Sequence, residues 1–175
     1  LSFCEFTTVT DAKFVGLKNY LRVFSDPTFM HALWFTALFT IVSVLTINVF
    51  AFVIAMLLTK GIKGTNFFRT VFFMPNLIGG IVLGYIWQIL LNGILGHFGR
   101  TLTYSSSYGF WGLIILMNWQ QVGYMMIIYI AGIQNIPGEL IEAAKMDGAS
   151  DWQLLKSVTI PMVMPSITIC TFLTL

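Results

Sequence analysis

Charged residues are scarce in this sequence. Only 9% of the 175 residues are Asp, Glu, Lys or Arg, whereas 57% are hydrophobic. An ordinary soluble domain carries roughly a quarter charged residues, so this shortage excludes a soluble globule and a disordered tail. The net charge of +2 is too small, and the basic residues are too scattered, for a surface that binds nucleic acid.

Residue types that carry out chemistry are also few. The two cysteines, Cys4 and Cys170, predict neither a disulfide framework nor a metal site. His31 and His97 are isolated, and the apolar stretches hold no nucleophile with a base and no carboxylate pair. The phosphate-binding pattern Gly-x-x-x-x-Gly-Lys-Ser/Thr does not occur. The sequence therefore predicts no catalytic residue, no metal ligand and no ATP hydrolysis in this chain.

Long apolar stretches make up most of the sequence. They cover about residues 31–59, 71–91 and 110–134, and a shorter one covers residues 161–175. Roughly 20 apolar residues cross a bilayer as a helix, so we predict an all-α fold, a polytopic transmembrane helical bundle. Within the second span, Pro75 predicts a kink, and Gly80-x-x-x-Gly84 offers a face for close helix packing.

The ends of the sequence suggest a piece of a longer protein. It begins without Met and stops inside an apolar stretch. We therefore expect residues 31–175 to be a transmembrane domain that is incomplete at both ends. Residues 1–30 are expected to be an external or interfacial segment that leads into the first span.

Basic residues predict which loops lie inside the cell. Lys60, Lys63 and Arg69 bring three cations and no acid into one short loop, the pattern that keeps a loop on the cytoplasmic side. Counting crossings from there puts residues 92–108 outside and residues 137–160 inside.

This second inside loop, residues 137–161, is polar although it separates two apolar spans. Pro137 is predicted to start a helix, Gly148 to stop it, Ser150 and Gln153 to form a capping box for a second helix, and Pro161 to end that helix. The two alanines Ala143 and Ala144 leave a low surface between acidic residues, suited to docking in a groove of another protein. From composition alone, an amphipathic hairpin lying on lipid is the favoured alternative.

The same loop carries a family motif. Glu142-Ala143-Ala144-x-x-Asp147-Gly148-Ala149, followed at fixed spacing by Val158-x-Ile160-Pro161, resembles the EAA loop of permease subunits of type I binding-protein-dependent ABC importers, which have a MetI-like transmembrane domain. Further short motifs resemble the carbohydrate-uptake branch and its MalF-like subunits: Phe14-Val15-Gly16-Leu17-Lys18-Asn19-Tyr20, Phe67-Phe68-Arg69, Pro75, Trp87 and Gly132-Ile133-Gln134-x-Ile136-Pro137.

The resemblance implies a multi-pass permease in a bacterial or archaeal cytoplasmic membrane. Its implied partners are a second permease subunit, two ATP-binding subunits that hold the ATP, an extracytoplasmic sugar-binding protein, the sugar and the lipid bilayer. No cofactor is expected in this chain. In the family the EAA loop couples the permease to the ATPase, which assigns that role to Glu142, Ala143, Ala144, Asp147, Gly148, Ala149 and Pro161.

A sugar path needs polar groups inside the membrane. Asn118, Gln121 and Tyr124 recur every third residue and form one polar side of the third span, which in MalF-like subunits lines the sugar site. Asn76 is a weaker candidate, and Asn48 is predicted to be a packing contact. The alternative is that the amides bond a neighbouring helix.

The sequence is also compatible with two other functions. One is an importer permease of the same type for an amino acid, a peptide or an oxyanion; the absence of Lys and Arg within the spans argues against it. The other is a channel or scaffold that works without an ATPase, for which the polar helix pair would have no use.

Overall fold

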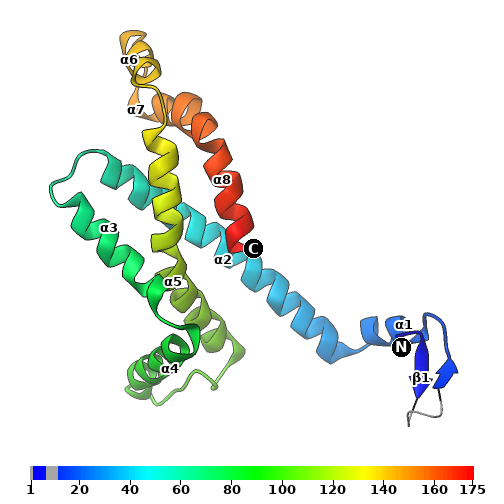
Figure 1. The fold of residues 1–175 in the computed structure, drawn as a ribbon. Coiled ribbons are helices and arrows are strands. Elements are labelled where there is room, and N and C mark those ends of the chain that lie inside the picture. The colour runs from blue at the N-terminus through cyan, green and yellow to red at the C-terminus, as the bar shows by residue number, and fades with distance from the viewer. Residues whose placement is uncertain (1, 7–11) are drawn as a thin grey trace. The chain divides into compact units, whose positions relative to one another are not determined.

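The computed structural model describes residues 2–6 and 12–175. The chain divides into two compact units, Leu1–Thr40 and Ile41–Leu175. The first unit contains a short hairpin, a short helix and the start of a long helix. The second contains the helical bundle (Figure 1).

In the first unit, strands β1 (Cys4–Phe6) and β2 (Ala12–Phe14) pair antiparallel, with Glu5 opposite Lys13. Helix α1 (Lys18–Phe24) follows, and helix α2 begins at Pro27. The Asn19 amide nitrogen donates to the carbonyl oxygens of Ser2 and Cys4, at 3.0 and 3.1 Å, and thereby ties α1 to the hairpin. The hairpin was not predicted from the sequence.

The second unit confirms the predicted all-α bundle. Its helices are the rest of α2 (Pro27–Thr59), α3 (Thr65–Phe73), α4 (Gly80–Gly96), α5 (Ser106–Gln134), α6 (Gly138–Met146), α7 (Asp151–Leu154) and α8 (Ile160–Thr174). A 3₁₀ turn, η1 (Met74–Leu77), follows α3, and a π-helical turn, η2 (Leu155–Thr159), precedes α8. Among the described residues, three helices are long and apolar enough to cross a membrane.

The core lies where α2, α5 and α8 meet. Small residues of α2, among them Ala51 and Ala55, are fully buried against the large side chains of Met126 and Tyr129 on α5. Val163 completes the core from α8. The buried small and large side chains fill this core together, and helices in lipid associate through such packing because lipid supplies no hydrophobic driving force.

Two glycines of α5 mark the tightest helix contacts. A Cβ at Gly123 would overlap the Phe72 carbonyl oxygen on α3, and one at Gly132 would overlap the Ser166 hydroxyl on α8. The predicted Gly80 and Gly84 face, by contrast, has open space around both glycines. Close packing therefore occurs in this chain, but on the third span instead of the second.

The predicted second span, residues 71–91, is not one continuous helix. Thr65–Leu77 and Gly80–Gly96 meet at an angle of 100°. Pro75 lies inside the stretch Thr65–Leu77, where its missing amide hydrogen is compatible with the 3₁₀ turn η1. The break follows at Ile78 and Gly79, which adopt extended conformations with ψ of 129° and 133°. The kink predicted from Pro75 is therefore a complete break, and α4 leaves large apolar side chains such as Ile81, 93% exposed, on its surface.

The end of the polar loop also differs from the prediction, because Pro161 does not end a helix. Helices α7, η2 and α8 form one helical stretch, Asp151–Thr174. Pro161 lies in the first turn of α8, where a missing amide hydrogen is tolerated, and the wider π-helical turn before it shifts the hydrogen-bond pattern. Across that turn, the Thr159 hydroxyl donates to the Leu154 carbonyl at 3.4 Å.

Candidate functional site

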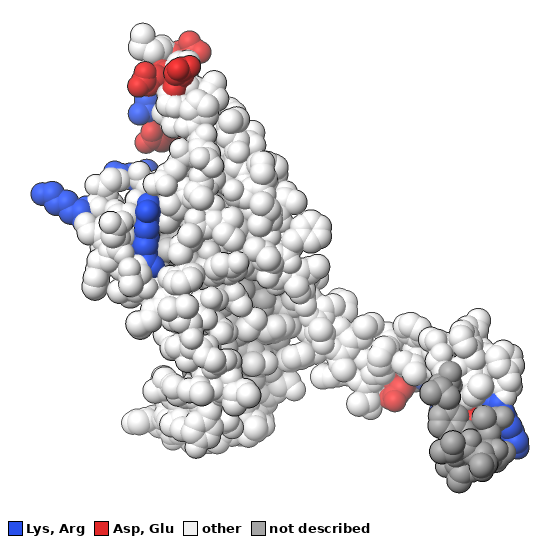
Figure 2. Space-filling model, viewed as in Figure 1, with Lys and Arg blue, Asp and Glu red and all other residues white. Residues whose placement is uncertain are grey.

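The predicted coupling loop forms one tip of the second unit. Figure 1 shows α6 and α7 at the same end as the loop between α2 and α3, with α4 at the opposite end. The predicted inside loops therefore lie at the same end of the second unit. Figure 2 shows acidic residues gathered on this tip and basic residues on the neighbouring loop, with an uncharged surface over the rest of the bundle in this view.

A tight turn at Gly148 separates the two helices of the tip. The Ala149 amide donates to the Ala144 carbonyl and the Gly148 amide donates to the Lys145 carbonyl, both at 3.0 Å. This pair of bonds is the Schellman arrangement that ends helices, and it requires a left-handed residue, which Gly148 supplies with φ of +81°. The predicted stop at Gly148 is confirmed.

The start of the second helix is also as predicted. The Gln153 amide donates to the Ser150 hydroxyl at 3.4 Å, and the Ser150 amide donates to the Gln153 side-chain oxygen at 2.8 Å. These reciprocal bonds form a capping box. Pro137 lies one position outside α6, as its N-cap residue. The loop geometry is thus specified locally, by residues within it.

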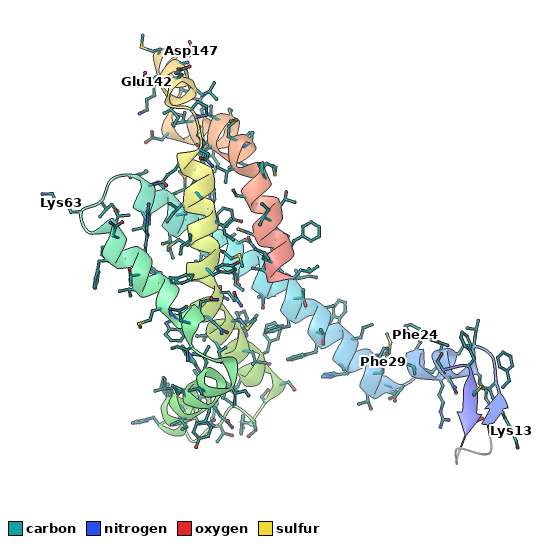
Figure 3. The ribbon with its side chains drawn as sticks, in the orientation of Figure 1. Lys13, Phe24, Phe29, Lys63, Glu142 and Asp147 are labelled. Carbon is teal, nitrogen blue, oxygen red and sulfur yellow. The ribbon has the colours of Figure 1, made fainter. Side chains whose placement is uncertain are left out.

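The tip presents most of its motif residues to the surroundings. Glu142, Ala143, Asp147, Gly148 and Pro161 are exposed, whereas Ala144 and Ala149 are half-buried. Figure 3 shows Glu142 and Asp147 at the end of the molecule's second unit. A hollow of about 270 Å³ lies between the two helices, lined by Ala144, Asp147, Gly148, Ala149, Gln153, Leu154, Ser157 and Val158.

Two apolar residues of the tip were not singled out from the sequence. Met146 is 88% exposed on α6, and Trp152 is 70% exposed on α7. Large apolar side chains in an otherwise polar loop were the available signal. Exposed Met and Trp beside charged residues are typical of protein contact surfaces, so the tip has the composition of an interface.

The structure separates the three polar residues of the third span. The Asn118 amide nitrogen donates to the Thr46 hydroxyl on α2 at 2.9 Å and to the Ile114 carbonyl at 2.8 Å. Asn118 therefore bonds a neighbouring helix, although its side-chain oxygen is buried without a partner among the described residues. Tyr124 instead lies near α3, with its ring centroid 6.5 Å from that of Phe73.

Gln121 and Tyr124 remain candidates for the path. Gln121 is half-buried and Tyr124 is 37% exposed, so both reach the surface of this chain. Asn76 is half-buried in the turn η1, at the break between α3 and α4. The assignment of these residues to a sugar path stays a prediction.

A polar cluster joins the three core helices. Tyr129 on α5 donates its hydroxyl to the Asn48 side-chain oxygen at 2.6 Å, and the Asn48 amide nitrogen donates to the Thr174 hydroxyl on α8 at 3.0 Å. The packing role predicted for Asn48 is confirmed. Its partners, Tyr129 and Thr174, were missed because nothing local in the sequence connects residues so far apart.

Apolar spanning helices with an exposed, charged helix pair at one end are the features of a polytopic membrane protein. Residues 23–175 match the family described as binding-protein-dependent transport system inner membrane component, and the chain belongs to this family. It is therefore an inner-membrane protein with several spans, as predicted.

The chain is also similar to curated proteins that are named as transport system permease proteins. The chain is 40% identical to the probable starch degradation products transport system permease protein AmyD of Thermoanaerobacterium thermosulfurigenes, over 99% of this chain and 62% of the relative. It is 33% identical to the multiple sugar-binding transport system permease protein MsmF of Streptococcus mutans, over 95% of this chain and 61% of the relative. The trehalose/maltose transport system permease protein MalF of Thermococcus litoralis is 29% identical, over 97% and 61%. The chain thus spans about three fifths of their length.

A solved structure supports the fold. The chain resembles one chain of a bacterial alginate ABC transporter, determined in complex with alginate pentasaccharide-bound periplasmic protein. The TM-score is 0.74 at 23% identity, over 91% of this chain and 59% of that chain. At this identity the likeness establishes the fold alone.

Proposed function

We propose that the full-length protein is a permease subunit of an ATP-driven sugar importer. The observation that carries the proposal is the exposed helix pair of residues 137–161, with Glu142 and Asp147 at its tip, in a chain of the transport family named above. The sugar class follows from the relatives, which are named for starch degradation products, multiple sugars, and trehalose and maltose.

The proposed partners are a second permease subunit, two ATP-binding subunits and an extracytoplasmic sugar-binding protein. ATP binds to the partner subunits. Glu142 forms a charge contact with a basic residue of an ATP-binding subunit, while the hollow beside Ala144 and Gly148 and the exposed Met146 receive the partner's surface. One charge-assisted contact of this kind contributes about 1.5 to 3 kcal/mol.

The helices on either side of the tip provide a route for the movement. Helix α5 reaches the loop at Gln134, and α8 leaves it as part of the helical stretch Asp151–Thr174. Both pack on α2 in one core. When the ATP-binding subunits close, a rigid tip transmits the displacement to these packed helices, which switches the access of the path between the two sides.

Gln121 and Tyr124, with Asn76, are the residues that we propose contact the sugar. A hydroxyl-rich solute needs hydrogen-bonding groups and an aromatic face, and Gln121 and Tyr124 supply both at the surface of α5. Asn118 acts next to them by holding α5 to α2 through Thr46.

The test uses the full-length subunit in nanodiscs. It is purified together with the permease and the ATPase that are encoded by adjacent genes. We expect sugar-loaded binding protein to stimulate ATP hydrolysis, and we expect Glu142→Ala to abolish most of that stimulation while assembly persists. Glu5→Ala, which removes an exposed acid of the hairpin, is the matched control and should behave as wild type. A panel of sugars and amino acids then identifies the solute. Failure of an ATPase to co-purify, or equal stimulation in both variants, contradicts the proposal.

A further inference from the structure

Helix α1 carries an apolar side that no described residue covers. Leu17, Tyr20, Leu21 and Phe24 follow the i, i+3, i+4, i+7 spacing that places side chains on one side of a helix. All four are exposed, Leu21 by 68% and Phe24 by 62%. In the adjoining hairpin, Phe14 is exposed as well. We refer to these five residues as the α1 apolar face.

The hairpin occupies a different side of α1. Asn19 bonds the carbonyl oxygens of Ser2 and Cys4, and the Val15 amide donates to the Phe3 carbonyl at 2.8 Å. The Phe3 ring also contacts the Tyr20 ring, with centroids 5.7 Å apart. The hairpin therefore fixes how α1 is oriented; it contacts the α1 apolar face at Tyr20 and leaves Leu17, Leu21 and Phe24 exposed.

The α1 apolar face lies directly beside the start of a spanning helix. Only Ser25 and Asp26 separate α1 from α2, and the Asp26 carboxylate accepts a hydrogen bond from the Thr28 amide at 2.8 Å. The rings of Phe24 and Phe29 meet edge to face, with centroids 5.9 Å apart. Figure 3 labels both side chains. Phe29, Leu33 and Trp34 are themselves exposed at this end of α2, where a spanning helix faces lipid.

Basic residues border this face. Lys18 and Arg22 lie one turn apart on α1, on the side between the apolar face and the hairpin, and Lys13 is exposed on β2. Long basic side chains beside an apolar helix face extend to lipid phosphates while the apolar side enters the acyl region. An open hollow of about 370 Å³, lined by Ser2, Asn19, Tyr20, Val23, Phe24 and Phe29, adds room for part of an acyl chain.

We propose that α1 is an interfacial anchor that binds the surface of the bilayer at the N-terminal end of α2. The α1 apolar face enters the acyl region, and Lys18 and Arg22 contact lipid phosphates. The occupant is lipid because the face continues onto the exposed apolar end of α2 and is bordered by cations. The anchor fixes the level at which the first span enters the membrane.

The test measures the depth of single residues in the full-length subunit, assembled with its partners in nanodiscs of phosphatidylcholine and phosphatidylglycerol. Cys4 and any reactive cysteine outside these residues are replaced by Ser; Cys170 is buried and stays. An environment-sensitive fluorophore is attached at Leu21→Cys, or at Leu17→Cys as a second position. Ile41→Cys on α2 is the control within lipid, and Glu5→Cys is the control in water.

We expect nitroxide-labelled lipid to quench the probes at Leu21 and Leu17 as strongly as the probe at Ile41. Aqueous iodide should quench them at least about threefold less than the probe at Glu5. Iodide quenching equal to that at Glu5 would place the face in water and overturn the proposal. Protection from both quenchers would show that a partner subunit covers the face, and it would overturn the proposal equally.

Discussion

Asn48 is a polar residue within an apolar helix, and its side chain bonds two other helices of the bundle. Its side-chain oxygen accepts a hydrogen bond from the Tyr129 hydroxyl, and its amide nitrogen donates one to the Thr174 hydroxyl. One side chain therefore connects α2, α5 and α8. Within a membrane no water competes for these groups, and an unsatisfied polar atom costs free energy. The cluster keeps together the helices that we propose transmit the movement of the tip.

Replacing Asn48 by Leu is expected to lower the free energy of unfolding by about 1 to 2 kcal/mol, because Tyr129 and Thr174 lose their shared partner. Denaturation of the full-length subunit in mixed micelles measures the change. Val49→Leu, an exposed apolar exchange at the next position of α2, is the control and should leave stability unaltered. Equal stability of the Asn48 variant and the control would show that the cluster contributes nothing.

At the scale of the element, the turn at Gly148 depends on backbone conformation. Its φ of +81° lies in the left-handed region, where a β-branched side chain is strained by roughly 1 to 2 kcal/mol. We predict that Gly148→Val reorients α6 and reduces the stimulation of the ATPase at least about fivefold. The reason is that a displaced Glu142 loses its proposed charge-assisted contact with the ATP-binding subunit. Assembly of the spans should persist, because no core residue changes.

Gly138→Ala is the matched control for this variant. Gly138 also has open space around it but has no positive φ, so Ala fits there without strain. Hydrolysis rates with and without loaded binding protein compare the two variants. If Gly148→Val retains normal stimulation, the turn geometry is unimportant for coupling.

Elements specified by local residues could be predicted from the sequence. The capping box of Ser150 and Gln153, the stop at Gly148 and the long apolar helices follow from signals within a few residues. The path of the chain after Pro75 could not, because a proline permits a mild kink as well as the 100° break. The effect of Pro161 depends in the same way on the π-helical turn before it.

Contacts between distant segments explain the other differences between the sequence-based predictions and the structure. The sequence offered Gly80 and Gly84 as a packing face, but the close contacts occur at Gly123 and Gly132, whose partners lie on α3 and α8. Asn118, Gln121 and Tyr124 share a spacing, and yet Asn118 bonds Thr46 while Tyr124 lies near Phe73. A spacing defines a side of a helix, but only the neighbouring helices determine what that side contacts.

At the scale of the whole molecule, we propose that the sugar path lies between this subunit and a second permease subunit. Gln121→Ala and Tyr124→Ala are each expected to raise the KM for sugar uptake about tenfold, since each removes roughly one hydrogen bond or ring contact with the solute. Counterflow or uptake into proteoliposomes measures the effect. Ile127→Ala, an exposed residue one turn further along α5, is the control and should retain the wild-type KM. An unchanged KM in both variants would remove these residues from the proposed path.

We propose that the tip of residues 137–161 contacts an ATP-binding subunit, and site-specific photo-crosslinking in cells can detect this contact. A photoreactive amino acid replaces Met146, 88% exposed on α6, or Phe98, 74% exposed beyond the opposite end of the bundle. This contact should give an adduct with the ATP-binding subunit from position 146 and none from position 98. No such adduct from position 146, in a complex that still imports the solute, would contradict it.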